Sequence, residues 1–317
     1  MKIYTFLQQN DGKPNRNSLE ALAAAQQLAE QTGGSVSAIV FGSNIETITD
    51  YDLAEIIQLQ NVELENFNPL AYVSAFENLI NAENPDMVVF GHTYETRDWV
   101  PRLSARLDIP FLTDCIGFKN EDEFVFTRQI NQGKINSDVK TTGLTIISIQ
   151  SGAFRLDSLK SGSASTREFT VDLSGISQSI RKGEKFQEAK GSVDLSRAEV
   201  IIAVGRGIGK EENMDVIKEL AKALNAEIGS SRPVVDYGWL PHEHQVGSSG
   251  QTVSPKLYFA IGISGAIQHQ VGMKSSDNII ALNKDENAPI FEIADFGVVA
   301  DLFEIIPKLT EKINSLS

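Results

Sequence analysis

The sequence contains very little cysteine. Cys115 is the only one in 317 residues, so the chain can form neither an internal disulfide nor a cysteine-rich metal site. A reducing, cytoplasmic location is therefore expected. Long apolar runs are also missing: no stretch reaches the ~18 residues that a membrane-spanning helix needs, so we expect no membrane span. The first ten residues, MKIYTFLQQN, hold only a short apolar run and do not predict a signal peptide.

Positive charge is scarce. Lysine and arginine total 28 against 42 aspartates and glutamates, which gives a formal charge of −14. Nucleic acid is therefore not expected as a partner, because phosphate binding needs clustered Lys and Arg. The 41% hydrophobic and 22% charged residues are typical of a globular protein. Since 317 residues are many for one domain, two domains are expected.

The familiar nucleotide-binding and catalytic motifs are absent. The segment VGRGIGK (Val204–Lys210) resembles two phosphate-binding motifs but fits neither. A P-loop requires glycine where Val204 stands and Ser or Thr where Glu211 stands, and a G-x-G-x-x-G fingerprint requires glycine at Lys210. No G-x-S-x-G elbow occurs, and no carboxylate pair is recognisable as an acid and a base. Any reactivity is then expected to come from a bound cofactor.

Several polar residues leave two interpretations open. His242 and His244 alternate like metal ligands, but no third ligand is visible and a polar loop is the favoured interpretation. Arg232 is either a ligand contact or a solvated surface charge. His92 follows a predicted strand and His269 starts a predicted helix, and hydrogen bonding within the fold is the plain alternative to a ligand role for both.

Strand and helix patterns alternate along the first half. Strands are predicted at 2–7, 35–43, 55–61 and 86–93, and helices at 18–34, 68–85 and 96–109. Pro101 is tolerable only in the first turn of its helix. Turn-separated β patterns between 123 and 173 predict strands that complete or extend this first sheet.

A polar stretch near residues 178–196 predicts a linker, and alternation then restarts. Strands are predicted at 198–204, 226–229, 257–262 and 278–283, and helices at 214–225 and near 298–313, the latter kinked or interrupted at Pro307. The predicted fold is therefore α/β, with two doubly wound parallel-sheet (Rossmann-like) domains at 1–193 and 194–317.

Small, polar and cationic residues follow each strand of the second domain. The segments are GRGIG (205–209), SSRP (230–233), SGAIQH (264–269) and NKD (283–285). Ligands of such sheets bind beyond the carboxyl ends of the strands, so a large anionic ligand is expected at this edge. The glycines of GISGAIQH, directly after the apolar run LYFAI, indicate that something presses against the backbone there.

Four blocks of the last third resemble the α subunit of electron-transfer flavoprotein in order and spacing. They are GRGIGKEEN, SRPVVDYGWLPHEHQVG, SPKLYFAIGISGAIQH and ALNKDENAPIFEIADFGVVADLFEIIP. A weaker resemblance extends over the first domain, chiefly through RDWVPRLSARLDIPFLTDC. The resemblance implies a heterodimer with a β subunit, with FAD in the C-terminal domain of the α chain and AMP or a second FAD on the β chain. It implies an electron carrier without a substrate of its own, which takes electrons from acyl-CoA dehydrogenases of fatty acid β-oxidation and passes them to a quinone reductase.

The resemblance also implies which residues contact FAD. Those expected to border the flavin are Arg206, Ser231 and Arg232. Those expected in a loop along the ring are Gln245, Val246, Gly247, Ser248 and Ser249. Those expected to hold the ribityl chain and ring edge are Ser264, Gly265, Ala266, Ile267, Gln268 and His269. Those expected at the adenosine end are Asn283, Asp301 and Leu302.

Physical chemistry agrees with this assignment. Reduced flavin carries negative charge near N1 and O2, so Arg232 and a charged His269 are expected at that edge. Glycines allow backbone N–H groups to approach phosphate, so GISGAIQH is expected to wrap a flavin. Two alternatives remain: an NAD- or FAD-dependent oxidoreductase with its own small substrate, which the missing acid, base and fingerprint disfavour, and a nucleotide-binding subunit with only an assembly role.

Overall fold

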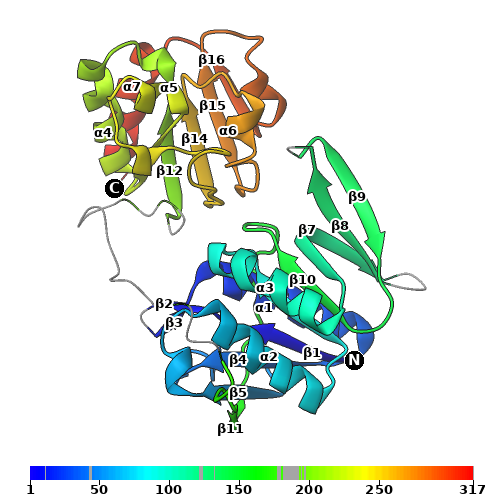
Figure 1. The fold of residues 1–317 in the computed structure, drawn as a ribbon. Helices are drawn as coiled ribbons and strands as arrows, with labels where there is room; N and C mark the ends of the chain where they lie inside the picture. Colours follow the sequence, from blue (N-terminus) through cyan, green and yellow to red (C-terminus); the bar gives the residue numbers. More distant parts are fainter. Residues whose placement is uncertain are drawn as a thin grey trace. The chain divides into compact units, whose positions relative to one another are not determined.

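The chain folds into two compact units, residues 1–186 and 187–317, each with its own sheet and core (Figure 1). The computed structural model describes residues 1–10, 12–42, 45–120, 124–131, 133–176, 180, 193, 195 and 198–316. The predicted domain boundary after residue 193 falls in a stretch of which the structure describes only residues 180, 193 and 195, and it stays a prediction. No helix among these described residues has the length and apolar character needed to cross a membrane.

The first unit is built on a nine-stranded sheet of order β11-β5-β4-β1-β6-β10-β7-β8-β9. Its strands are β1 (Lys2–Phe6), β4 (Ser35–Phe41), β5 (Glu55–Gln60), β6 (Met87–Gly91), β7 (Phe111–Asn120), β8 (Phe124–Ile130), β9 (Ile135–Lys140), β10 (Thr145–Ile149) and β11 (Ser165–Thr170). A small ribbon pairs β2 (Gln9–Asn10) with β3 (Lys13–Pro14). The α/β class is confirmed, and the strands after residue 123 do extend the first sheet. That sheet is mixed rather than purely parallel, because β7, β8 and β9 pair antiparallel through short connections that leave no room for a crossover helix.

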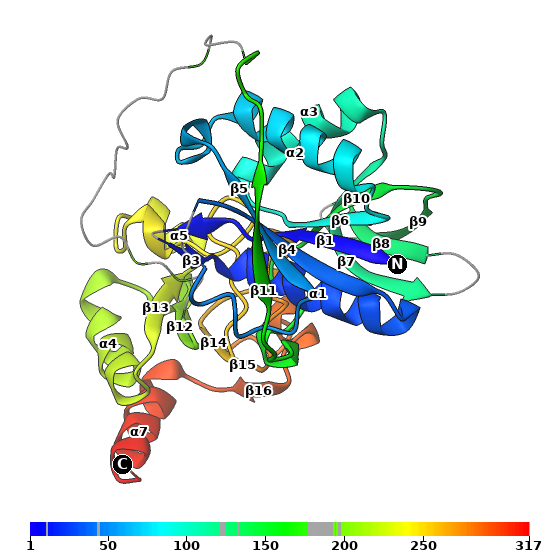
Figure 2. The same ribbon diagram turned by 90° about the horizontal axis from the view of Figure 1, so that it is seen from below.

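Helices cover both faces of this sheet (Figure 2). The helix α1 (Arg16–Thr32) packs an alanine-rich side on one face and ends at Gly33, whose φ of 62° is left-handed. The helices α2 (Pro69–Glu83) and α3 (Tyr94–Leu107) cover the other. Pro101 lies in the middle of α3, so the first-turn prediction is wrong. Proline removes the donor to the carbonyl of Arg97, and the helix tolerates this because Arg97 and Pro101 are both exposed, so that water can bond the carbonyl.

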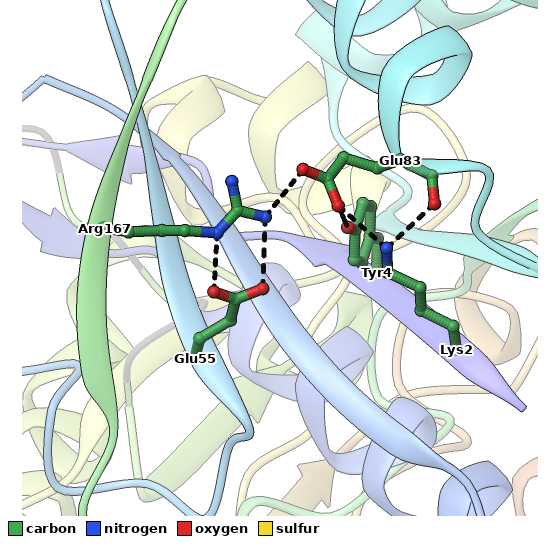
Figure 3. A network of polar contacts seen from close by, with 5 residues as sticks. All are labelled: Lys2, Tyr4, Glu55, Glu83 and Arg167. Carbon is green, nitrogen blue, oxygen red and sulfur yellow. Dashed lines mark hydrogen bonds and ion pairs between the residues drawn. The ribbon is translucent and has the colours of Figure 1, made fainter.

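A polar network fastens the edge strand β11 to the rest of the sheet (Figure 3). Arg167 of β11 donates from Nε to Glu55 Oε2 of β5 at 2.6 Å and from Nη2 to Glu83 Oε1, at the end of α2, at 2.9 Å. Glu83 Oε2 also accepts from Lys2 Nζ at 2.8 Å and from Tyr4 Oη at 3.1 Å. One carboxylate therefore joins the first strand of the unit to its last.

The second unit is a five-stranded parallel sheet of order β13-β12-β14-β15-β16. Its strands are β12 (Val200–Val204), β13 (Glu227–Ser230), β14 (Leu257–Ile261), β15 (Ile279–Asn283) and β16 (Phe296–Val299), and its helices are α4 (Met214–Ala223), α5 (Arg232–Asp236), α6 (Ile267–Gln270) and α7 (Leu302–Asn314). The last two residues of β16, Val298 and Val299, were expected to begin the last helix. They belong to an edge strand instead, and α7 starts where Asp301 accepts a hydrogen bond from Phe303 N at 2.8 Å. Pro307 does not interrupt α7.

The predicted linker at 178–196 lies mostly outside the described residues. The prediction is wrong for Leu195, near the end of this stretch. Leu195 is only 1% exposed and packs in the core of the second unit together with Ile201 and Val246. Before the linker, Val171 and Leu173 are buried in the core of the first unit. The chain is thus anchored on both sides, and the second unit begins before residue 196.

Candidate functional site

The carboxyl edge of the second sheet gathers the four segments that the sequence singled out. All five strands run parallel, so the chain leaves β12, β13, β14 and β15 at the same edge. Residues 205–209, 230–233, 262–269 and 283–285 follow these strands directly. The expected juxtaposition is confirmed, and the edge is the place for a ligand in a sheet of this kind.

Two glycine-rich turns press against each other at this edge. A Cβ on Gly207 would lie 2.7 Å from the Cα of Gly262, whose own φ is +63°. The amide of Gly207 donates to Gly262 O at 3.0 Å, and the amide of Gly205 donates to Ile261 O at 2.8 Å. The expectation that something presses on the GISGAIQH backbone is confirmed, but the contact is the neighbouring turn. These glycine N–H groups are therefore not available to a phosphate.

The turn from Ser264 to Gln268 offers a different set of hydrogen-bond donors. The backbone N–H groups of Ser264, Gly265, Ala266, Ile267 and Gln268 form no hydrogen bond to an acceptor in the described part of the chain. Gly265 has a φ of +84° and lies so close to the backbone of Ile290 that a side chain would not fit. Consecutive amides without an acceptor in such a turn can bind an anion, so these residues fit a phosphate group.

The loop from Gln245 to Gln251, called the 245–251 loop below, is held in place before any ligand binds. Gln245 is buried and its Nε2 donates to Ser249 Oγ at 2.9 Å. The amide of Ser248 donates to Gln268 O at 2.7 Å, which ties the loop to α6. Val246 and Gly247 are buried, so only the side chains of Ser248 and Ser249 face outward among the predicted contacts of this loop.

His269 is a buried neutral residue rather than a cation. It is 6% exposed, and its Nε2 lies 2.9 Å from Tyr258 Oη. Burial lowers the pKa of His269 to about 4, although the backbone of Val246 raises it in part. Its Nδ1 forms no hydrogen bond of normal geometry with the described residues. In the chain by itself His269 is therefore neutral near neutral pH. The positive charge expected on it beside reduced flavin stays a prediction.

Arg232 and Arg206 are two exposed cations at this edge. Arg232 is the first residue of α5, its side chain is 71% exposed, and its Nε lies 3.3 Å from Asp236 Oδ2 on the same helix. Arg206 is also exposed, at the start of the turn after β12. Ser231, before α5, is 8% exposed. Both side chains are exposed and can turn toward an anionic ligand. For Arg232 this would break the ion pair with Asp236.

The three residues expected at the adenosine end have local structural roles. Asn283 Nδ2 donates to Ile263 O at 2.9 Å, and its Oδ1 accepts from the amide of Asp285 at 3.0 Å. Asp301 caps α7, and Leu302 is 7% exposed in the core. Of the three, only Asp301 is largely exposed in the described chain.

The side chains of His244 and His92 make hydrogen bonds within the fold, and His242 is exposed. His244 Nδ1 lies 2.6 Å from Ile228 O and holds the turn of residues 242–244 against β13. In the first unit, His92 Nδ1 lies 2.9 Å from Ser148 Oγ, and burial lowers the pKa of His92. The plain interpretation of both residues accounts for their contacts.

The sequence patterns did not indicate two residues that contact the predicted site residues. Tyr258 is a fully buried tyrosine in the apolar run LYFAI, and its hydroxyl was a signal, because a buried tyrosine hydroxyl needs a partner. Gln251 follows the GSSG segment and carries no periodic or motif signal. Its side chain hydrogen-bonds to three backbone groups, on Val193, Leu195 and Glu243. These belong to two segments that are distant in sequence, which only the folded chain reveals.

Comparison with known proteins gives a consistent result. Residues 3–174 match the family model described as electron transfer flavoprotein domain, and residues 194–274 match the electron transfer flavoprotein FAD-binding domain. An electron transfer flavoprotein subunit alpha of Thermoanaerobacterium thermosaccharolyticum is 36% identical, covering 99% of this chain and 98% of that protein. The electron transfer flavoprotein subunit alpha of Bacillus subtilis is 35% identical, covering 100% of this chain and 98% of that protein. An acryloyl-CoA reductase electron transfer subunit beta of Anaerotignum propionicum is 32% identical, covering 98% of this chain and 95% of that protein.

Proposed function

Because this chain belongs to the electron transfer flavoprotein family and resembles its α subunits over almost its whole length, we propose that it is the α subunit of a heterodimeric electron carrier. Its second unit is the FAD-binding domain. The observation that carries the proposal is the run of five free amides, Ser264–Gln268, which lies inside the segment matched by the FAD-binding model. An anionic dinucleotide supplies the acceptors that this turn lacks.

The residues of the carboxyl edge divide the work of holding FAD. The resemblance placed Ser264–Gln268 at the ribityl chain and ring edge; we propose instead that their amides hold the pyrophosphate, because a run of amides without acceptors suits an anion. The exposed Arg206 and Arg232 balance negative charge. Ser248 and Ser249 present hydroxyl groups from the 245–251 loop. Ser231 and Asp301 complete the edge. FAD supplies the one-electron and two-electron chemistry when bound, and the protein supplies position and electrostatics.

The partners are proposed from the same relationship. A β subunit completes the heterodimer, and dehydrogenases of acyl-CoA compounds are the donor class. The name of the Anaerotignum propionicum relative, an electron transfer subunit of acryloyl-CoA reductase, supports a CoA-linked partner. A quinone reductase is the proposed acceptor, and the cytoplasm is the proposed location.

Coexpression with the β subunit encoded by the same organism tests the proposal. We expect a yellow heterodimer with one FAD at the edge described above, reducible by an acyl-CoA dehydrogenase and its substrate. The isolated α chain should lose FAD on dialysis, because the exposed edge residues come from one side only. Turnover of a small substrate without a dehydrogenase would favour an oxidoreductase, and a colourless heterodimer without affinity for FAD would favour a purely structural subunit.

A further inference from the structure

We propose that Gln251 is a positioning residue that fastens the 245–251 loop to the segment through which the chain enters the second unit. The proposal rests on the proposed function where it concerns FAD, and on the geometry of the chain alone where it concerns the loop. Gln251 itself is not among the residues expected to contact FAD.

The carboxamide of Gln251 joins three backbone groups. Its Oε1 accepts from the amide of Leu195 at 3.1 Å, and its Nε2 donates to Val193 O at 2.9 Å and to Glu243 O. The orientation of the amide is determined by these partners, because a flipped amide would place Nε2 against an N–H group and Oε1 against two carbonyls. One side chain thus links Val193 and Leu195 to Glu243, which precedes the loop.

The backbone of Gln251 closes the loop at the same point. Its amide donates to Gln245 O at 2.7 Å, and its carbonyl accepts from the amide of Gly247 at 3.1 Å. The exposed residues Ser248 and Ser249 lie between these two closing contacts. The position of Gln251 therefore determines how the two serine hydroxyls are presented at the carboxyl edge.

Apolar packing supports the same connection from the other side. A Cβ on Gly229 of β13 would lie 3.3 Å from a methyl group of Val246 and 3.6 Å from a methyl group of Leu195. Leu195 and Val246 thus lie against the same point of the sheet, and both are at most 2% exposed. The entry segment and the loop share hydrogen bonds and a core contact, so a displacement of one is transmitted to the other.

Two substitutions test the role of the side chain. Gln251→Met keeps the length and volume but removes all three hydrogen bonds, and Gln251→Glu removes the two bonds that Nε2 donates. In the full-length α chain without FAD, we expect the amide of Ser248 to exchange with deuterium about tenfold faster in both variants. In the heterodimer, the dissociation constant of FAD should rise by about tenfold.

A pH profile separates positioning from a general loss of structure. A protonated carboxyl group regains one donor, so the Ser248 amide of Gln251→Glu should be better protected at pH 5 than at pH 8, relative to wild type. Gln251→Met should show no such recovery. The matched control is Asn278→Asp, which removes one donor to Lys256 O, just before β14; Asn278 forms no hydrogen bond with the described residues of the loop. The control should leave both Ser248 exchange and FAD binding unchanged.

Unchanged Ser248 exchange in both variants would overturn the proposal, as would an equal effect of Asn278→Asp. The exchange measurement needs no FAD, so it tests the positioning role even if the wild-type heterodimer binds none. Failure of the wild type to bind FAD would instead overturn the proposed function. Faster exchange with an unchanged dissociation constant of FAD would overturn the link between Gln251 and cofactor binding.

Discussion

The hydroxyl of Tyr258 lies 2.9 Å from Nε2 of His269, and both side chains are buried in the second unit. Burial raises the pKa of Tyr258 well above its ordinary value, so the phenol stays protonated. We assign the phenol as the donor and Nε2 of the imidazole as the acceptor, and the tautomer of His269 follows from this assignment. Nε2 is then unprotonated, and the single ring proton of the neutral imidazole lies on Nδ1, on the side of the ring away from Tyr258. Two neutral groups therefore fix the ring orientation beside the 245–251 loop.

Removing the tyrosine hydroxyl should destabilise the second unit. Tyr258→Phe leaves Nε2 of His269 buried without a partner, at an expected cost of about 1–3 kcal/mol in the free energy of unfolding. Denaturant unfolding followed by a probe in the second unit measures this cost. Tyr237→Phe is the control, because Tyr237 is 58% exposed, and it should change stability by less than about 0.5 kcal/mol. Equal effects of the two substitutions would contradict the role of the Tyr258–His269 pair.

The second unit should lose stability on mild acidification because of His269. Its folded pKa of about 4 lies below the ordinary value of 6.5, so the unfolded chain binds more protons between these values. The contribution is fully present above pH 6.5 and is lost as the pH falls toward 4, by on the order of 3 kcal/mol. Nitrogen chemical shifts of the His269 ring should report a neutral imidazole at pH 6. A charged ring at that pH, or the same pH slope in His269→Gln, would contradict this assignment.

Glu83 should stabilise the first unit more than a glutamate with a single partner. Glu83→Gln weakens its contacts with Lys2, Tyr4 and Arg167, and because Glu83 is partly exposed we expect a loss of only about 1–2 kcal/mol in the free energy of unfolding. The control is Glu77→Gln on the same helix, which removes one ion pair, with Arg106, and should cost less than about 0.5 kcal/mol.

The same carboxylate gives a pH test. Its hydrogen bond with Lys2 is the largest cause that lowers the pKa of Glu83 below the ordinary value of 4.5. The stabilising contribution is therefore present above pH 4.5 and is lost as the pH falls through the folded pKa. The wild-type advantage over Glu83→Gln should shrink in that window. A difference that is independent of pH down to 3 would rule out the ionised network as its source.

Arg232 should raise the reduction potential of the bound flavin. Arg232→Ala removes an exposed cation, so we expect the potential to fall by about 20–60 mV, with Arg232→Lys restoring part of the loss because it lacks the planar fork. Asp236→Ala should shift the potential in the opposite direction, since it frees Arg232 from its ion pair. Redox titration of the heterodimers measures all three. An unchanged potential in Arg232→Ala with FAD still bound would place Arg232 outside the site.

Much of the fold follows from local pattern. The periods of 2 and 3.6 residues predicted most strands and helices, such as the alanine-rich α1 with its Gly33 stop, because these signals need only neighbours in sequence. The same patterns failed at Val298 and Val299, where a short apolar run before a helix cap fits a strand or a helix equally well. The capping Asp301 marks the true helix start, and pairing with β15 decides the strand.

The sequence by itself determined the alternation of strands and helices and, through four motifs in a fixed order, the kinship of the second unit with FAD-binding domains. Only the tertiary structure decided what individual side chains do there. It showed that Gly205 and Gly207 serve the packing of two turns, that His269 is neutral, and that Gln251 joins residues 193, 195 and 243. The reason is physical: burial, the pKa of a buried group and hydrogen bonds between distant segments arise only when folding brings those segments into contact.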